Sequence, residues 1–239
     1  MEALQNQETI TVSRREFKYM VDLKDRLYLL DALNKILVPD AYGGYNGYRV
    51  RSVYFDAIDN QDYIGKMKKK EFVKRMRIRI YDTKDETAKF ELKRKLNGHQ
   101  VKDSVVITKE DAIRIQEGDF SPLLKYNSPT AKLGYELGHS MGYRPISLVE
   151  YSRRAFTHPN FNTRITLDNR LRYTHMNTDL YQEEPNYQYA MPLRKTILEV
   201  KFEKFLFSQI QFALSQCNLE KCKVSKFGSS RSLLEEFYY

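Results

Sequence analysis

Arg75-Met-Arg-Ile-Arg-Ile80 places an arginine at every second position of a run that is otherwise typical of a buried β-strand. Side chains of a strand point alternately to its two faces, so these arginines form a charged row backed by an apolar row. Three further segments share the alternation: Lys89-Phe-Glu-Leu-Lys93, Arg164-Ile-Thr-Leu-Asp168 and Ile197-Leu-Glu-Val-Lys201. Together they predict a sheet with one apolar face and one charged, mostly positive face.

Two arrangements of such a sheet are compatible with the pattern. A solvated outer face gives the same alternation and is the ordinary explanation for any single strand. Four strands rich in arginine favour instead a closed barrel whose lumen carries the charges and whose outer face is covered by helices. An unpaired buried charge costs several kcal/mol, so this lumen would be wet or filled by an oxygen-rich anion.

Composition limits the possible partners and the number of domains. With 239 residues and 41% hydrophobic content, we expect one domain over residues 1–239. The net charge of +9 favours a polyanion: nucleic acid, an anionic membrane surface, a nucleotide or an inorganic phosphate chain. The sequence has no long apolar run and no signal peptide, so we expect a cytoplasmic protein. Cys217 and Cys222 lack histidines at zinc-ligand spacing, so a zinc site of the finger type is not expected.

Strand and helix patterns alternate irregularly along the chain, without a repeat or a linker. Helix starts are indicated at Asp22, at Thr108 with Asp111, and at Ser128 before a proline, and a further helix is expected at 207–216. We therefore expect an α+β protein built on an eight-stranded antiparallel β-barrel with helices packed around the outside. The eight strands are expected at about 15–21, 48–56, 72–81, 88–96, 100–107, 146–157, 162–173 and 194–202.

Eight short motifs follow one another between about residues 14 and 230. They are Arg15-Glu-Phe-Lys-Tyr19, Arg51-Ser-Val-Tyr-Phe-Asp56, Arg77-Ile-Arg79, Phe90-Glu-Leu-Lys93, Tyr151-Ser-Arg-Arg-Ala-Phe156, Arg164-Ile-Thr-Leu-Asp168, Ile197-Leu-Glu-Val-Lys201 and Ser225-Lys-Phe227. In this order they resemble the VTC (vacuolar transporter chaperone) domain of polyphosphate polymerases, within the triphosphate tunnel metalloenzymes that include the CYTH proteins. The resemblance implies an antiparallel tunnel lined with basic residues.

The resemblance also implies the residues of the site. The catalytic positions are Lys18, Arg77, Arg79, Arg153 and Lys226, and further phosphate contacts are Lys93, Lys102, Arg164, Lys201 and Lys223. Lys102 follows a turn expected at Asn97-Gly98. Arginine offers a planar fork for bidentate phosphate contact, whereas lysine is a compact, mobile charge.

Glu199 occupies the metal-ligand position of the family, with Glu16 and Glu91 as weaker candidates. Carboxylate and phosphate oxygens together suit Mn²⁺ or Mg²⁺. Two structural alternatives stay open: Glu199 could pair with Lys201 in an ion network, and Lys223 and Lys226 could neutralise the dipole near the end of the last helix. Tyr54 is interpreted as a packing residue or an anchor for these side chains.

The implied activity is binding of ATP or another nucleoside triphosphate and transfer of its terminal phosphate to a growing polyphosphate chain. The alternatives are a metal-dependent tripolyphosphatase or nucleoside triphosphatase, and a polyphosphate-binding sensor or scaffold without catalysis. The first strand favours the polymerase branch, because Arg14 stands where hydrolases carry the first carboxylate of Glu-x-Glu-x-Lys. A membrane-protein partner is compatible with this function. Nucleic acid is not expected, since the aromatic residues do not repeat along one strand face.

Overall fold

A single antiparallel sheet organises the computed structural model, which describes residues 15–44, 47–96 and 99–235. Its strands run in the spatial order β11-β1-β10-β8-β7-β3-β4-β5-β6, while β2 pairs with β7 and β9 with β8. The eight long strands are β1 (Arg15–Val21), β3 (Tyr48–Asp56), β4 (Val73–Ile80), β5 (Thr87–Leu96), β6 (His99–Thr108), β7 (Arg144–Thr157), β8 (Arg164–Thr174) and β10 (Thr196–Phe202). Each lies where the sequence predicts it. The short strands β2 (Val38–Pro39), β9 (Gln188–Tyr189) and β11 (Glu220–Lys221) were not predicted.

The helices follow the expected start signals in three cases. They are α1 (Leu23–Ile36), α2 (Gln61–Met67), α3 (Lys109–Gln116), α4 (Pro129–Met141), α5 (Ser208–Ser215) and α6 (Lys226–Glu235), with a 3₁₀ turn at Ser121–Lys125. The hydroxyl of Thr108 accepts a hydrogen bond from the backbone N–H of Asp111 at 3.2 Å, as the sequence predicts for a helix start. Neither α2 nor α6 was predicted. α6 begins Lys-Phe-Gly-Ser-Ser, which contains weak helix formers.

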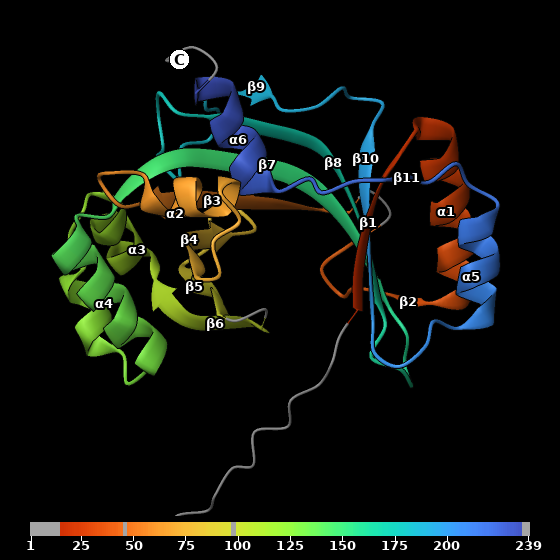
Figure 1. The fold of residues 1–239 in the computed structure, drawn as a ribbon, viewed down its shortest axis with the longest axis horizontal. Helices are drawn as coiled ribbons and strands as arrows, with labels where there is room; N and C mark the ends of the chain where they lie inside the picture. Colours follow the sequence, from red (N-terminus) through yellow and green to blue (C-terminus); the bar gives the residue numbers. More distant parts are fainter. Residues whose placement is uncertain (1–14, 45–46, 97–98, 236–239) are drawn as a thin grey trace, which may run out of the picture.

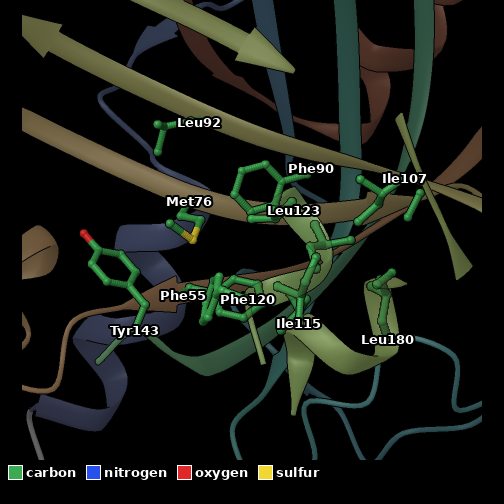
Figure 2. Close-up of a cluster of buried hydrophobic side chains, with 14 of the residues drawn as sticks. Phe55, Met76, Phe90, Leu92, Ile107, Ile115, Phe120, Leu123, Tyr143 and Leu180 are labelled. Carbon is green, nitrogen blue, oxygen red and sulfur yellow. The ribbon is translucent and has the colours of Figure 1, made fainter. Parts of the chain in front are cut away.

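Four helices, α1, α3, α4 and α5, pack on the outer, apolar face of the sheet in two groups (Figure 1). α1 and α5 cover β1, β8 and β10, where leucines of the helices meet the apolar rows of the strands. α3, α4 and the 3₁₀ turn cover β3 to β6, and Figure 2 shows Phe55, Phe90 and Phe120 in this second core. α4 approaches closely because it has glycines at the contact: a Cβ at Gly138 would lie 2.2 Å from the Phe120 ring. Both cores hold the sheet in a curved shape.

The sheet curls so that β1 and β10 face β4 and β5 across its concave side (Figure 1). Its end strands in the described residues, β11 and β6, do not pair with each other, so the curl has two edges. The predicted α+β architecture, an antiparallel sheet with helices outside, is confirmed. Closure into a hydrogen-bonded barrel is not observed. The Asn97-Gly98 turn lies outside the described residues.

One end of the concave face is apolar and is covered by α6. Phe227 is fully buried, and its ring lies 5.4 Å from that of Tyr54 and 6.3 Å from that of Tyr63, which belongs to α2. This packing places the first residues of α6 against β7 and β8 and closes one side of the concave space. Within the described residues, no helix is both long enough and apolar enough to cross a membrane.

Candidate functional site

A cavity of about 200 Å³ occupies the charged part of the concave face. Nine lysines and arginines but only three glutamates line it, and they come from six strands and from the start of α6. The cations are Lys18, Arg75, Arg77, Arg79, Lys93, Lys102, Arg153, Lys201 and Lys226, and the acids are Glu16, Glu91 and Glu199. Cations that outnumber acids in a partly buried space repel one another, so an anionic ligand would relieve the repulsion in this cavity.

Glu91 organises the cations on β4, β5 and β6. Its carboxylate accepts hydrogen bonds from Arg77 Nε at 2.6 Å and from Lys102 Nζ at 2.9 Å, and it lies 3.3 Å from Arg79 Nη1. Burial alone would raise the pKa of Glu91, but these three cations outweigh it and lower the pKa to about 2. Arg77 Nη1 also donates to the Tyr54 hydroxyl at 3.0 Å, so Tyr54 is an anchor for this side chain.

Asp168 organises a second group of cations, which come from β7 and α6. This carboxylate is completely buried and accepts two hydrogen bonds from Arg153, at 2.7 and 2.8 Å. Lys226 Nζ contacts it at 2.5 Å. Burial would raise the pKa of Asp168, but Arg153 and Lys226 hold it well below its usual range. The aromatic ring of Tyr151 lies beside both cations, 4.6 Å from Lys226 Nζ and 5.2 Å from the Arg153 guanidinium.

Three cationic side chains keep hydrogen-bonding capacity that protein acceptors do not use. Arg79 Nε is buried and has no hydrogen-bond partner among the described residues. Arg75 makes only a 3.4 Å contact with the hydroxyl of Ser225, and Lys93 forms no ion pair within the described part of the chain. Burial, and then Arg75, lower the pKa of Lys93 to about 8. The donors of Arg75 and Lys93 are therefore available to the oxygens of a ligand in the cavity.

Glu199, Glu16, Lys18 and Lys201 form an ion network at the β1–β10 side. Lys201 Nζ lies 2.6 Å from a Glu199 oxygen and 3.7 Å from a Glu16 oxygen, and Lys18 contacts Glu16 at 3.1 Å. Burial would raise the pKa of Glu199, but Lys201 and Lys18 lower it to about 2. The pairing expected from the ion-network interpretation is thus present, and it lies inside the cavity.

The structure brings together most of the residues predicted for the site. The five predicted catalytic residues line the cavity, as do Lys93, Lys102, Lys201 and Glu199. Two predicted phosphate contacts do not. Arg164 opens β8 and is held by Asp40 at 2.8 Å outside the lining, and Lys223 is exposed on the segment that precedes α6. The alternative that Lys223 and Lys226 neutralise the dipole near the end of the last helix is wrong, because the last described helix, α6, begins at Lys226.

Two residues that matter for the site were not assigned to it from the sequence. Arg75 shares a strand face with Arg77 and Arg79, and the alternation that predicts the charged row would have included it. Asp168 likewise follows the alternation of β8, but the pattern alone does not indicate that a carboxylate holds Arg153 and Lys226 together.

The donor set for a divalent metal is small. The described residues contain no cluster of three or more histidine, cysteine, aspartate or glutamate side chains arranged to hold a metal. Glu91 is paired with three cations, whereas Glu16 is paired with Lys18 and Lys201, and Glu199 with Lys201, among the described residues. Mg²⁺ is commonly bound by one or two carboxylates together with substrate phosphates and water. Glu199 and Glu16 fit a metal that arrives with a phosphate ligand.

The curled sheet, the outer helices and the basic concave face define a class of protein, the triphosphate tunnel fold. An adenylyl cyclase candidate from Hippeastrum, described as having a dominant triphosphatase activity, is similar in structure at 16% identity, with a TM-score of 0.58 over 92% of this chain and 96% of that chain. A candidate adenylate cyclase from Bacillus halodurans is similar at 15% identity, with a TM-score of 0.53 over 88% and 92%. At this identity the likeness concerns the fold.

The family is identified by the sequence. A model of the VTC domain matches residues 13–235, nearly the whole chain, so the protein belongs to the VTC domain family. Comparison with curated protein sequences gives no match. The family indicated by the eight motifs is confirmed.

Proposed function

We propose that the protein binds a nucleoside triphosphate through its phosphates in the basic cavity and transfers the terminal phosphate to a polyphosphate chain. The observation that carries the proposal is the composition of the cavity wall, with nine cations and three glutamates among the described residues. A triphosphate supplies both the negative charge and the many acceptor oxygens that these donors lack. Membership of the VTC domain family supports the same choice.

The cations differ in what they contribute to phosphoryl transfer. Arg77 is fixed by Glu91 and Tyr54, and Arg153 and Lys226 are fixed by Asp168, so they are preorganised to hold phosphate oxygens in one geometry. Phosphoryl transfer depends mainly on such positioning and on neutralising charge that develops on the transferred group. Arg75 and Lys93 lack carboxylate partners in the described residues and can approach the ligand freely.

The residues that could activate water favour transfer to a chain over hydrolysis. A general base works best when its pKa lies near the working pH, but the pKa values of Glu91 and Glu199 are both lowered to about 2. A polyphosphate end is already negatively charged and needs no proton removed before it attacks. Hydrolysis is the second candidate, supported by the triphosphatase activity described for the Hippeastrum protein.

Glu199, with Glu16, is the place where Mn²⁺ or Mg²⁺ would be held. Such an ion neutralises phosphate charge and polarises the transferred group. The carboxylate of Glu199 would lower phosphate affinity in a cavity without metal, because like charges repel. A metal held by Glu199 and Glu16 would offset this repulsion.

Thermal unfolding with and without ligand tests the proposed binding. Tripolyphosphate at about a hundred times its dissociation constant should add about 2.7 kcal/mol of stability. For a chain of this length this corresponds to an increase in Tm of roughly 5–11 °C. The gain should shrink as salt concentration rises. Equal stabilisation by neutral sugars, or none by tripolyphosphate, contradicts a phosphate-filled cavity.

A further inference from the structure

A second basic groove of about 180 Å³ lies beside the cavity, between the segment that follows α2 and the ends of β4 and β5. Seven of its nine lining residues are lysine or arginine, and none is acidic. Arg94 is paired with Asp103 at 2.6 Å. The six others are Lys66, Lys69, Lys70, Arg75, Lys93 and Lys95. The groove therefore differs from the cavity, whose cations are interleaved with glutamates.

The groove and the cavity are continuous along the sheet. Arg75 and Lys93 are paired across β4 and β5, and both line the two spaces. The next pair on the same strand face is Val73 with Lys95, which belongs to the groove alone. Thus the cationic row of β5 continues from the cavity into the groove through Lys93 and Lys95, whereas the row of β4 ends at Arg75.

Lys66 stands at the junction of the two spaces. Its ammonium group lies against the first turn of α6, where a Cβ added to Gly228 would come within 1.7 Å of Nζ. Burial, followed by Arg75 and Lys18, lowers the pKa of Lys66 to about 8. An acidic neighbour would relieve this repulsion, but the groove has none.

Apart from Arg94, the cations of the groove have no carboxylate partner among the described residues. Across the described ranges, Lys66, Lys69, Lys70, Lys93 and Lys95 form no ion pair, whereas most cations of the cavity do. Lys69 also has a left-handed backbone with φ of 53°, a conformation in which glycine is unstrained. The chain thus has a cation here although its backbone conformation favours a residue without a side chain.

We propose that this groove binds the part of a polyphosphate chain that extends beyond the cavity, so that one chain occupies both sites. The inference rests on the proposed function and assigns a separate site to the growing chain. A triphosphate is accommodated in the cavity and does not reach Lys69 and Lys70, whereas a longer chain passes Arg75 and Lys93 and gains contacts in the groove. Affinity should therefore rise with chain length beyond three phosphates.

The test compares tripolyphosphate with long-chain polyphosphate by isothermal titration calorimetry, on the full chain. The variant Lys69→Gly with Lys70→Ala removes two exposed cations and relieves the strained backbone at residue 69, so it is not expected to impair folding. Lys68→Ala is the matched control, since Lys68 is exposed in the same segment but does not line the groove. Two exposed charge contacts together should change long-chain affinity by about five- to tenfold.

We expect the double variant to lose this affinity for the long chain, with tripolyphosphate binding unchanged and the control unaffected. Equal loss for both ligands, or no loss for either, overturns the proposal. If tripolyphosphate binds and chain length brings no gain, the groove proposal fails while the proposed function stands. If neither ligand binds, both fail. Loss of binding to anionic phospholipid vesicles with long-chain affinity intact would assign the groove to a membrane surface instead.

Discussion

Replacing Asp168 with asparagine removes the carboxylate that holds two cations of the cavity and keeps the size of the side chain. Asp168 is completely buried, and both of its oxygens accept hydrogen bonds, from Arg153 and from Lys226. An amide offers one acceptor oxygen and no charge. The substitution therefore leaves Arg153 and Lys226 close together without a neutralising partner.

The expected cost follows from the burial of the three groups. Removing one partner of a buried ion pair costs about 3–5 kcal/mol. The lower end applies to this variant, because the amide retains one acceptor and the side chains of Arg153 and Lys226 are 15% and 14% exposed. A loss of about 3 kcal/mol corresponds to a decrease in Tm of roughly 6–12 °C for a chain of this length.

Thermal unfolding at neutral pH, with and without tripolyphosphate, measures the effect. The ligand should stabilise Asp168→Asn more than the parent, because phosphate oxygens take the place of the missing carboxylate. Thr166→Val is the control: Thr166 lies on the same strand face, and its buried hydroxyl has no hydrogen-bond partner within the described part of the chain, so its loss should be neutral. The reasoning is refuted if Asp168→Asn is no less stable than Thr166→Val, or if tripolyphosphate stabilises it no more than the parent.

The same contact predicts a pH dependence of stability in the parent. Arg153 and Lys226 depress the pKa of Asp168 in the folded protein in spite of its burial. Its contribution is therefore complete above the unfolded pKa of about 3.9 and is lost as pH falls through the lower folded value. Urea unfolding at acidic pH should show this decline in the parent and a smaller one in Asp168→Asn.

Three further predictions concern other side chains of the site. The pKa values of Lys66 and Lys93 are lowered to about 8, so polyphosphate affinity measured by calorimetry should fall above pH 8, while the free energy of unfolding without ligand rises. The variant with arginine at both positions should retain its polyphosphate affinity above pH 8. If its affinity falls as much as that of the parent, Lys66 and Lys93 are not the groups that titrate. Arg75→Gln should weaken tripolyphosphate binding without a loss of Tm, whereas Arg164→Gln should leave binding unchanged. Weaker binding by Arg164→Gln together with unchanged binding by Arg75→Gln would place the ligand outside the cavity. Glu199→Gln should lose metal-dependent turnover of nucleoside triphosphate and bind polyphosphate without metal at least as well as the parent; unchanged turnover would exclude Glu199 as the metal ligand.

The long strands and the charged concave face could be predicted from the sequence, because alternation along a strand is a local property. Arg77 and Arg79 share a row whatever the rest of the fold is, and their place in the cavity follows once the sheet curls. The edges of the sheet could not be predicted, because closure depends on pairing between strands far apart in the chain. The short helices α2 and α6 were missed because their stability comes from contacts such as that of Phe227 with Tyr54.

Individual site residues were predicted less well where a distant partner decides the direction of a side chain. Arg164 has the same strand pattern as Lys201, but Asp40 holds it outside the cavity. In the sequence, Asp168 is one more member of a charged row. Only the fold shows that Arg153 and Lys226 contact it. The direction of these side chains depends on tertiary contacts, which the spacing of residues along the chain does not predict.

Transfer of labelled phosphate tests the central claim most directly. The purified protein is incubated with ATP labelled in its γ-phosphate and with Mn²⁺, and the products are resolved by chain length on a gel. The proposed function predicts that the label enters chains longer than the starting triphosphate and that the Glu199→Gln variant forms none. Label found only in inorganic phosphate would identify a triphosphatase. No turnover with any divalent metal, together with tight polyphosphate binding, would contradict the enzymatic account and leave a phosphate-binding protein.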